Sequence, residues 1–224
     1  FFCIYAQMIT AYAQLPKVDA YIEKFTKENN FNGTILIERN DKTVYKKSFG
    51  LANFPFKLPN TTDTKYKIAS ITKAFTSVLI LQLYEQGKID LNKTINTYLP
   101  DYKGIAGDKV TVKQLLNMTS GMHNMDDGTS LESVLKDGIP QYQIPRTADQ
   151  MLVKYCSDTL VSEPGSEFDY NNADFIILGI IIEKVTGKSY EENLNEKLLR
   201  PLKMWNSGML AQEKIVDKLA DTYF

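Results

Sequence analysis

Apolar positions along the chain follow helical periodicity at the start and then alternate, which predicts one helix followed by a β-hairpin. A helix is expected from Lys17 to Glu28, with one apolar face made by Val18, Tyr21, Ile22 and Phe25. Strands are expected from Thr34 to Glu38 and from Thr43 to Phe49, on either side of a polar turn. A hairpin alone is marginal in water and needs more strands beside it, and the chain as given does not obviously supply them.

Two later stretches are apolar on nearly every side, which is typical of helices buried in the centre of a domain. The first runs from Lys67 to Tyr84 and stops at Gly87. The second begins with Asn172 as its expected cap and closes at Gly187. Its apolar core is far too short to cross a bilayer, so we expect it to pack inside the protein.

Capping boxes predict the starts of three further helices, because a Ser or Thr is followed three residues later by Gln or Glu. They begin at Thr111, Thr147 and Ser189. Between the first two lies a polar stretch from residue 122 to 145, rich in Gly and Pro. We expect this stretch to be a loop with at most one short helix, and the place where substrate preference varies.

Composition excludes several classes of function. The net charge is −1 and the charges are evenly spread, so no basic face for nucleic acid is expected. The 2 cysteines, Cys3 and Cys156, form no disulfide framework or metal-binding spacing. The single histidine, His123, is expected to be a polar loop residue, and we expect neither a zinc site nor any other cofactor.

The N-terminal residues resemble part of a secretory signal peptide. An apolar run leads to Ala11-Tyr12-Ala13, which has the small-x-small form of a cleavage site. We therefore expect residues 1–13 to be a signal-peptide remnant, residues 14–224 to form a single domain, and the protein to be secreted or periplasmic. An amphipathic lead-in to the fold is the alternative, and lipidation at Cys3 is disfavoured by the bulky residues before it.

Candidate chemistry lies at the start of the first apolar helix, where Lys73 follows Ser70 by three positions. Such residues are neighbours on a helix, so the lysine can accept the serine proton or stabilise the alkoxide. The positive end of the helix dipole favours negative charge at the same place. A second Ser-x-x-Lys, from Ser133 to Lys136, opens no long helix, and we interpret it as a chance match.

A possible partner is the Tyr-x-Asn formed by Tyr170 and Asn172, which follows a Pro-Gly turn and precedes the second apolar helix. A nearby ammonium would lower the pKa of a tyrosine and make it a usable proton acceptor. The alternative is a packed tyrosine followed by a helix cap. Motif and position alone do not choose between these two interpretations.

Four motifs in this order resemble the serine β-lactamase and penicillin-binding-protein superfamily, and within it the class C β-lactamases, D-alanyl-D-alanine carboxypeptidases and related esterases. They are Ser70 to Lys73, Leu115 to Gly121, Pro164 to Asn172, and Gly179 to Tyr190. Class A enzymes carry Ser-Asp-Asn as the second motif, where Tyr-x-Asn stands here.

This resemblance implies an α+β fold of the β-lactamase/transpeptidase type, with a helical subdomain at about residues 65–200 inserted after the N-terminal hairpin. It also implies that Ser70 is the acylated nucleophile and that Lys73 and Tyr170 share the proton transfers. Asn172 would orient the lysine and the amide of a small-molecule or peptide substrate. Which of Lys73 and Tyr170 is the formal base is left open, as is the oligomeric state.

The family's third motif, Lys-Thr-Gly or His-x-Gly on a late strand, does not occur among these 224 residues. That strand usually supplies the second oxyanion N–H group. We therefore expect a partial chain of a longer protein, whose 224 residues alone would be weakly folded and inactive.

The leading hypothesis is a serine hydrolase that acts through an acyl-enzyme on a β-lactam, a D-Ala-D-Ala peptide or a small ester. The alternative is a non-catalytic penicillin-binding or sensor module of the same fold. A Ser-His-Asp hydrolase is disfavoured, because no Gly-x-Ser-x-Gly elbow occurs.

Overall fold

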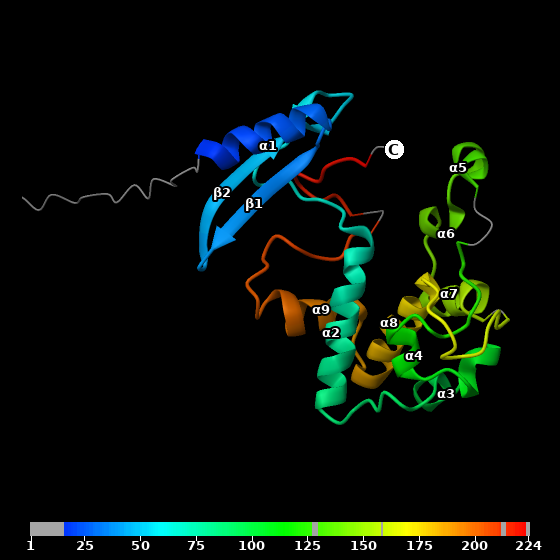
Figure 1. Cartoon of the computed structure of the whole chain (residues 1–224). Helices are drawn as coiled ribbons and strands as arrows, with labels where there is room; N and C mark the ends of the chain where they lie inside the picture. Colours follow the sequence, from blue (N-terminus) through cyan, green and yellow to red (C-terminus); the bar gives the residue numbers. More distant parts are fainter. Residues whose placement is uncertain (1–15, 127–129, 158, 212–213, 223–224) are drawn as a thin grey trace, which may run out of the picture. The chain divides into compact units, whose positions relative to one another are not determined.

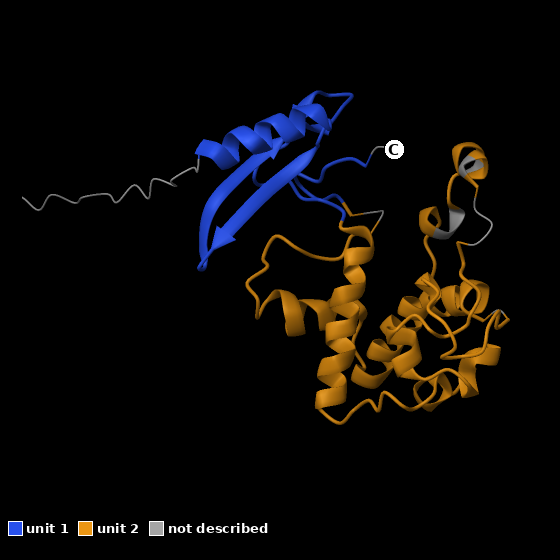
Figure 2. Ribbon diagram, in the orientation of Figure 1, with its two compact units in different colours: residues 1–67, 215–224 blue, residues 68–214 orange. Residues whose placement is uncertain are grey.

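The computed structural model describes residues 16–126, 130–157, 159–211 and 214–222, so the proposed signal-peptide remnant lies outside the described residues. The chain divides into two compact units, coloured separately in Figure 2. The first comprises residues 1–67 and 215–224, and the second residues 68–214. The fold is mixed α and β, and the prediction of a single domain over residues 14–224 stays a prediction.

The first unit is built on the predicted hairpin, which Figure 1 shows beside helix α1. Strands β1 (Gly33–Arg39) and β2 (Lys42–Phe49) pair antiparallel, with a register shift after Ile37. The turn residues Asn40 and Asp41 have φ values of 50° and 58°, the left-handed pair that a two-residue hairpin turn requires. The hairpin prediction is therefore confirmed.

Further pairing in the first unit was not predicted from the sequence. Strands β3 (Leu51–Asn53) and β4 (Leu58–Pro59) form a second two-stranded sheet. Lys65 and Leu219 form a parallel bridge between segments far apart in the chain. These strands are too short for hydrophobic alternation to reveal them.

Helix α1 (Pro16–Glu28) confirms the predicted helix but not its predicted buried face. Ile22 and Thr26 are buried, whereas Tyr21 and Phe25 are exposed. Lys47 on β2 donates hydrogen bonds to Glu23 at 2.5 Å and to Asp19 at 3.4 Å. These ion pairs fix how α1 lies along the hairpin. A face defined by apolar residues alone thus missed the contribution of Thr26 and of the ion pairs.

The second unit is helical and is arranged around α8 (Asn172–Thr186), which packs against α2 (Thr72–Glu85) and several shorter helices. A 3₁₀ turn, η1 (Ala69–Ile71), leads into α2. The other elements are α3 (Ile95–Tyr98), η2 (Ile105–Asp108), α4 (Val112–Leu116), α5 (Leu131–Asp137), α6 (Pro140–Gln143), α7 (Ala148–Tyr155), α9 (Tyr190–Leu194) and η3 (Asn195–Leu199), labelled where possible in Figure 1.

The core of this unit forms where α8 and α2 meet. The buried α8 side chains include the large aliphatic residues Ile177, Leu178, Ile180, Ile181 and Ile182. From α2 the buried side chains are Thr76, Leu79, Ile80 and Leu83. Burying each aliphatic side chain is worth about 1.5–3 kcal/mol, so this contact is a main source of the unit's stability.

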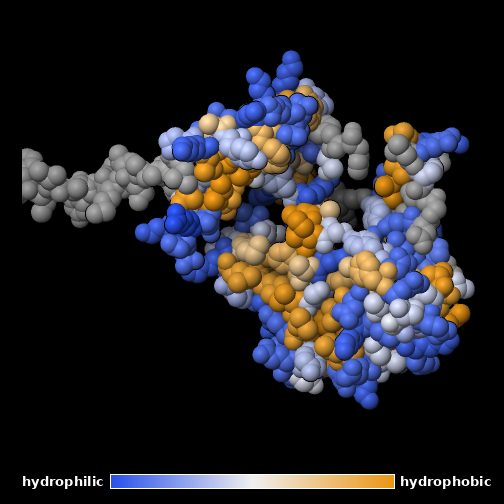
Figure 3. Space-filling model, viewed as in Figure 1, coloured by the Kyte–Doolittle hydropathy of each residue, from blue (hydrophilic) through white to orange (hydrophobic). Residues whose placement is uncertain are grey.

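The outer side of α2 differs from the prediction of a helix buried all round. Val78, Leu81 and Tyr84 are 42%, 46% and 51% exposed. Figure 3 shows apolar residues gathering over α2 on the visible face. The periodic pattern could not separate these positions from the buried ones, because both sets are apolar.

Local signals for the helix starts were largely accurate. All three predicted capping boxes are present, before α4, α7 and α9. The cap of α8 is Asn171 rather than Asn172, because the Asn171 side chain accepts a hydrogen bond from the Ala173 amide and the helix begins at Asn172. The stretch from residue 122 to 145 holds two short helices, α5 and α6, where at most one was predicted.

No helix among the described residues is both long and apolar enough to span a membrane.

Candidate active site

Ser70 lies in the 3₁₀ turn η1, at the entrance to α2, and is exposed to solvent. The residue before it, Ala69, has a φ of 43°, a left-handed conformation that few non-glycine residues adopt. The Ile71 amide donates to the Ile68 carbonyl at 3.1 Å, which closes this turn. The turn places the Ser70 hydroxyl one helical turn from Lys73.

Lys73 links the candidate residues through its ammonium group. Its Nζ donates to Ser70 Oγ at 3.2 Å, to Tyr170 OH at 2.6 Å, and to Asn172 Oδ1. An ammonium has three N–H donors, so these three acceptors match its capacity. Nζ also lies 4.5 Å from the Tyr170 ring centroid and 5.6 Å from that of Phe175, positions that favour a cation.

Tyr170 completes the group, because its hydroxyl donates to Ser70 Oγ in a short contact. Burial by itself raises the pKa of the phenol. The hydrogen bonds that Tyr170 shares with Lys73 and Ser70, together with the Lys73 charge, outweigh this and lower the pKa of Tyr170 below its ordinary value. A lowered pKa makes the phenolate more accessible near neutral pH.

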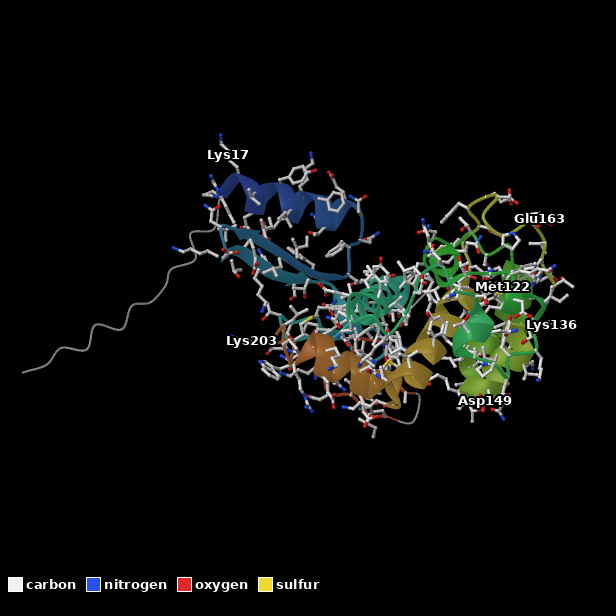
Figure 4. All side chains as sticks on the ribbon, turned by 90° about the horizontal axis from the view of Figure 1, so that it is seen from below. Lys17, Met122, Lys136, Asp149, Glu163 and Lys203 are labelled. Atoms are coloured by element: carbon white, nitrogen blue, oxygen red, sulfur yellow. The ribbon has the colours of Figure 1, made fainter. Side chains whose placement is uncertain are left out.

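The loop that carries Tyr170 is fixed by buried contacts to the segment after α4. Asn171 is 1% exposed, and its Nδ2 donates to the Met122 carbonyl at 2.7 Å. Met122 is labelled in Figure 4. The Asp169 amide donates to the Met118 carbonyl at 2.9 Å. The resemblance motif that begins at Leu115 therefore lies where it supports the Tyr170 loop.

The structure brings all four predicted site residues together, although Ser70 and Tyr170 are 100 positions apart in the sequence. Their roles in catalysis stay predictions. The sequence also matches the family described as Beta-lactamase over residues 18–223, a range that contains all four. The chain belongs to the beta-lactamase family.

Relatives within this family are recognisable in sequence and in structure. Protein flp of Staphylococcus aureus (strain COL) is 34% identical over 196 residues, covering 86% of this chain and 38% of that protein. A penicillin binding protein from Bacillus halodurans has a TM-score of 0.76 and 29% identity, with 89% of this chain and 59% of that chain covered. A class C beta lactamase gives a TM-score of 0.72 at 25% identity, with 92% and 53% covered. The chain thus spans between 38% and 59% of these three relatives.

The sequence analysis missed two residues that contact Asn172. Asn172 Nδ2 donates to Asp126 Oδ2 at 2.5 Å and to Tyr142 OH at 2.9 Å. The predicted contact of Asn172 with a substrate amide would need one of these bonds to open. Asp126 and Tyr142 come from the stretch predicted to be a variable loop, and no motif there marked them.

The second Ser-x-x-Lys does not form a comparable group. Ser133 lies in α5, where its Oγ donates to the Ser130 carbonyl at 2.8 Å as part of the helix start. The described residues contain no group of three or more His, Cys, Asp or Glu side chains placed to hold a metal ion. The candidate chemistry of this beta-lactamase-family chain therefore centres on Ser70.

Proposed function

We propose that the protein is a serine hydrolase that forms an acyl-enzyme on Ser70, using a β-lactam, a D-Ala-D-Ala peptide or a small ester as substrate. The observation that carries the proposal is the contact of Ser70 Oγ with both Lys73 Nζ and Tyr170 OH. The names of relatives in the family, a penicillin binding protein and a class C beta lactamase, support the substrate class.

In the proposed acylation, Tyr170 acts as the proton acceptor and Lys73 as a fixed cation. The Tyr170 phenolate takes the Ser70 proton while Oγ attacks the substrate carbonyl carbon, whose π electrons move to its oxygen. When the tetrahedral intermediate collapses, the bond to the leaving nitrogen or oxygen breaks and that atom takes the proton from Tyr170. Lys73 stabilises the phenolate throughout, since it donates to Tyr170 OH at 2.6 Å.

Deacylation would use the same groups in reverse. Water gives a proton to Tyr170 as it attacks the acyl carbon, and Ser70 Oγ regains that proton when it leaves. A chain that is acylated but not deacylated would instead be a penicillin-binding or sensor module. Both forms share the first step, so one set of measurements separates them.

The test is covalent labelling followed by turnover assays. A fluorescent penicillin should label the full-length native protein, which is the parent in all these tests, and mass spectrometry of the labelled peptide should place the adduct on Ser70. Ser70→Ala should abolish labelling, whereas the matched variant Ser133→Ala should retain it. An adduct on Ser133 or an unlabelled parent would refute the proposal.

Turnover of a penicillin, a D-Ala-D-Ala peptide and a nitrophenyl ester then identifies the preferred substrate. Stoichiometric labelling without turnover of any of the three would favour the sensor module.

We also propose that the protein is exported, on the basis of the apolar N-terminal run ending in Ala-Tyr-Ala. N-terminal sequencing of the mature protein should find Gln14 as the first residue. A mature chain that retains residues 1–13 would contradict cleavage at this site.

A further inference from the structure

The side-chain amide of Asn172 has two ends of opposite character, and only one of them suits Lys73. The amide oxygen accepts a hydrogen bond from the Lys73 ammonium. Rotation of the amide by half a turn would instead direct an NH₂ group at that ammonium, placing two donors against each other. Groups on the other side of Asn172 therefore either reinforce or oppose the orientation that Lys73 requires.

Asp126 and Tyr142 favour the same orientation through the hydrogen bonds that they form with Asn172 and with each other. Asp126 Oδ2 accepts from Asn172 Nδ2 at 2.5 Å and from Tyr142 OH at 2.6 Å. Tyr142 OH in turn accepts from Asn172 Nδ2 at 2.9 Å. An ionised carboxylate only accepts hydrogen bonds, so the rotated amide would place its oxygen against a negative charge.

Tyr142 remains a donor over the neutral range of pH. Burial, together with the hydrogen bond to Asp126 and the charge of that carboxylate, raises the pKa of Tyr142 above its ordinary value. A neutral phenol keeps its proton, which it donates to Asp126. This bond holds the carboxylate in place opposite Asn172.

We propose that Asp126 is a positioning residue, which orients the Asn172 amide so that its oxygen holds the Lys73 ammonium beside Ser70. The inference rests on the proposed function of these residues in acylation. Asp126 has no step of its own in the reaction. The proposed positioning reaches Ser70 through Asn172 and Lys73, whereas the charge of Asp126 by itself raises the pKa of Tyr170 and so opposes its use as a base.

A double-mutant cycle separates positioning from a general structural role. Asp126→Ala should slow acylation of the parent by a fluorescent penicillin by about 10-fold or more, the scale expected when a reacting group is misplaced. In an Asn172→Ala background the same substitution should cause no further slowing, because the residue through which Asp126 acts is gone. Equal slowing in both backgrounds, or none in the parent, would overturn the proposal.

Two further variants control for folding and for charge. Asp126→Asn keeps the size of the side chain but can present either an oxygen or an NH₂ group to Asn172, so it should also slow acylation. Glu132→Gln removes one negative charge from α5, and within the described part of the chain Glu132 makes no hydrogen bond or ion pair with Asn172, so it should leave the rate unchanged. Slowing by Glu132→Gln as large as that by Asp126→Asn would attribute the effect to net charge and overturn the proposal.

An NMR measurement tests the orientation without relying on activity. Nuclear Overhauser effects between the Asn172 side-chain NH₂ protons and the Tyr142 ring should be present in the parent and in Glu132→Gln, and lost in Asp126→Ala. Their absence in the parent, or their persistence in Asp126→Ala, would overturn the positioning role. If the parent is never acylated but these effects behave as expected, the proposed function fails while the orientation by Asp126 stands.

Discussion

Helices α2 and α8 are both strongly apolar, yet they are used differently. α8 buries residues on most of its sides, including Ile177, Leu178 and Ile181, each 0% exposed. α2 buries one side only, and Val78 and Leu81 on its other side are more than 40% exposed. The reactive group follows this division, because the turn η1 carries Ser70 and the exposed start of α2 carries Lys73, whereas α8 anchors the loop that brings Tyr170. Apolar composition identified both helices but not which one forms the centre of the unit.

The largest expected effect tests this difference in burial. Ile181→Ala should lower the free energy of unfolding by about 2–5 kcal/mol, because it removes buried methylene groups and leaves a cavity. The matched variant Leu81→Ala on α2 should lower it by less than about 1 kcal/mol, since Leu81 is 46% exposed. Urea unfolding of both variants measures the two losses. Similar losses would show that α2 is as buried as its composition suggests.

The next prediction concerns a carboxyl group inside α8. Asp174 is 0% exposed, and its two oxygens have no hydrogen-bond partner among the described residues. Burial raises the pKa of Asp174 to about 7. The negative charge of Asp169 raises this pKa further, whereas the nearby Ser120 hydroxyl lowers it. Burial also raises the pKa of the adjacent Cys156 thiol, to about 12, so this neighbour stays neutral.

Because the folded-state pKa of Asp174 lies above its ordinary value of 3.8, the folded protein holds this proton more tightly than the unfolded chain. Its contribution to stability is therefore complete below about pH 4 and is lost as pH rises to about 7. The total loss is up to about 4 kcal/mol, since one pKa unit corresponds to about 1.4 kcal/mol. Asp174→Asn should remove this dependence, so the difference in unfolding free energy between variant and parent should change across that range. A constant difference would show that folding does not shift the pKa of Asp174.

The smallest of the three effects concerns the hydrogen bond between Lys73 on α2 and Tyr170 in the loop before α8. Tyr170→Phe and Lys73→Ala should each slow acylation by about 10²-fold, or about 2.7 kcal/mol, the usual scale for lost proton-transfer assistance. The double variant should be slowed by less than the product of the two, because the residues act as one unit. Stopped-flow acylation rates provide the measurement. Parental rates in Tyr170→Phe would make Tyr170 a structural residue.

The pH dependence of the parent rate sharpens this prediction. Loss of the Tyr170 proton activates the proposed base, so acylation should rise with pH through the lowered pKa of Tyr170. Lys73→Ala removes the donor and the charge that lower that pKa, so the rise should move to higher pH. An unchanged profile in Lys73→Ala would exclude Tyr170 as the titrating group.

Features governed by neighbouring residues in the chain could be predicted from the sequence. The hairpin, the three capping boxes and the Ser70–Lys73 spacing each depend on residues within a few positions of one another. The cap of α8 was placed one residue late, because Asn171 and Asn172 are the same residue type and only their tertiary contacts, with Met122 and Lys73 respectively, distinguish them. A choice between identical neighbours therefore needed the tertiary structure.

Features that depend on distant contacts could not be predicted. Asp126 and Asn172 are separated by 46 positions, and neither Asp126 nor Tyr142 belongs to a motif. The exposure of one side of α2 likewise depends on which elements pack against it. For these features the sequence contains the residue types but not their distances.

The three contacts of Lys73 Nζ give this side chain a task that resembles that of a coordinated metal ion. Ser70, Tyr170 and Asn172 each present one oxygen to a single compact positive centre. An ammonium directs its three N–H bonds tetrahedrally, whereas a guanidinium spreads its five donors over a plane. Arginine would preserve the charge but not this arrangement of directions. At position 73 the shape of the cation, and not only its sign, therefore limits which residue the site can accept.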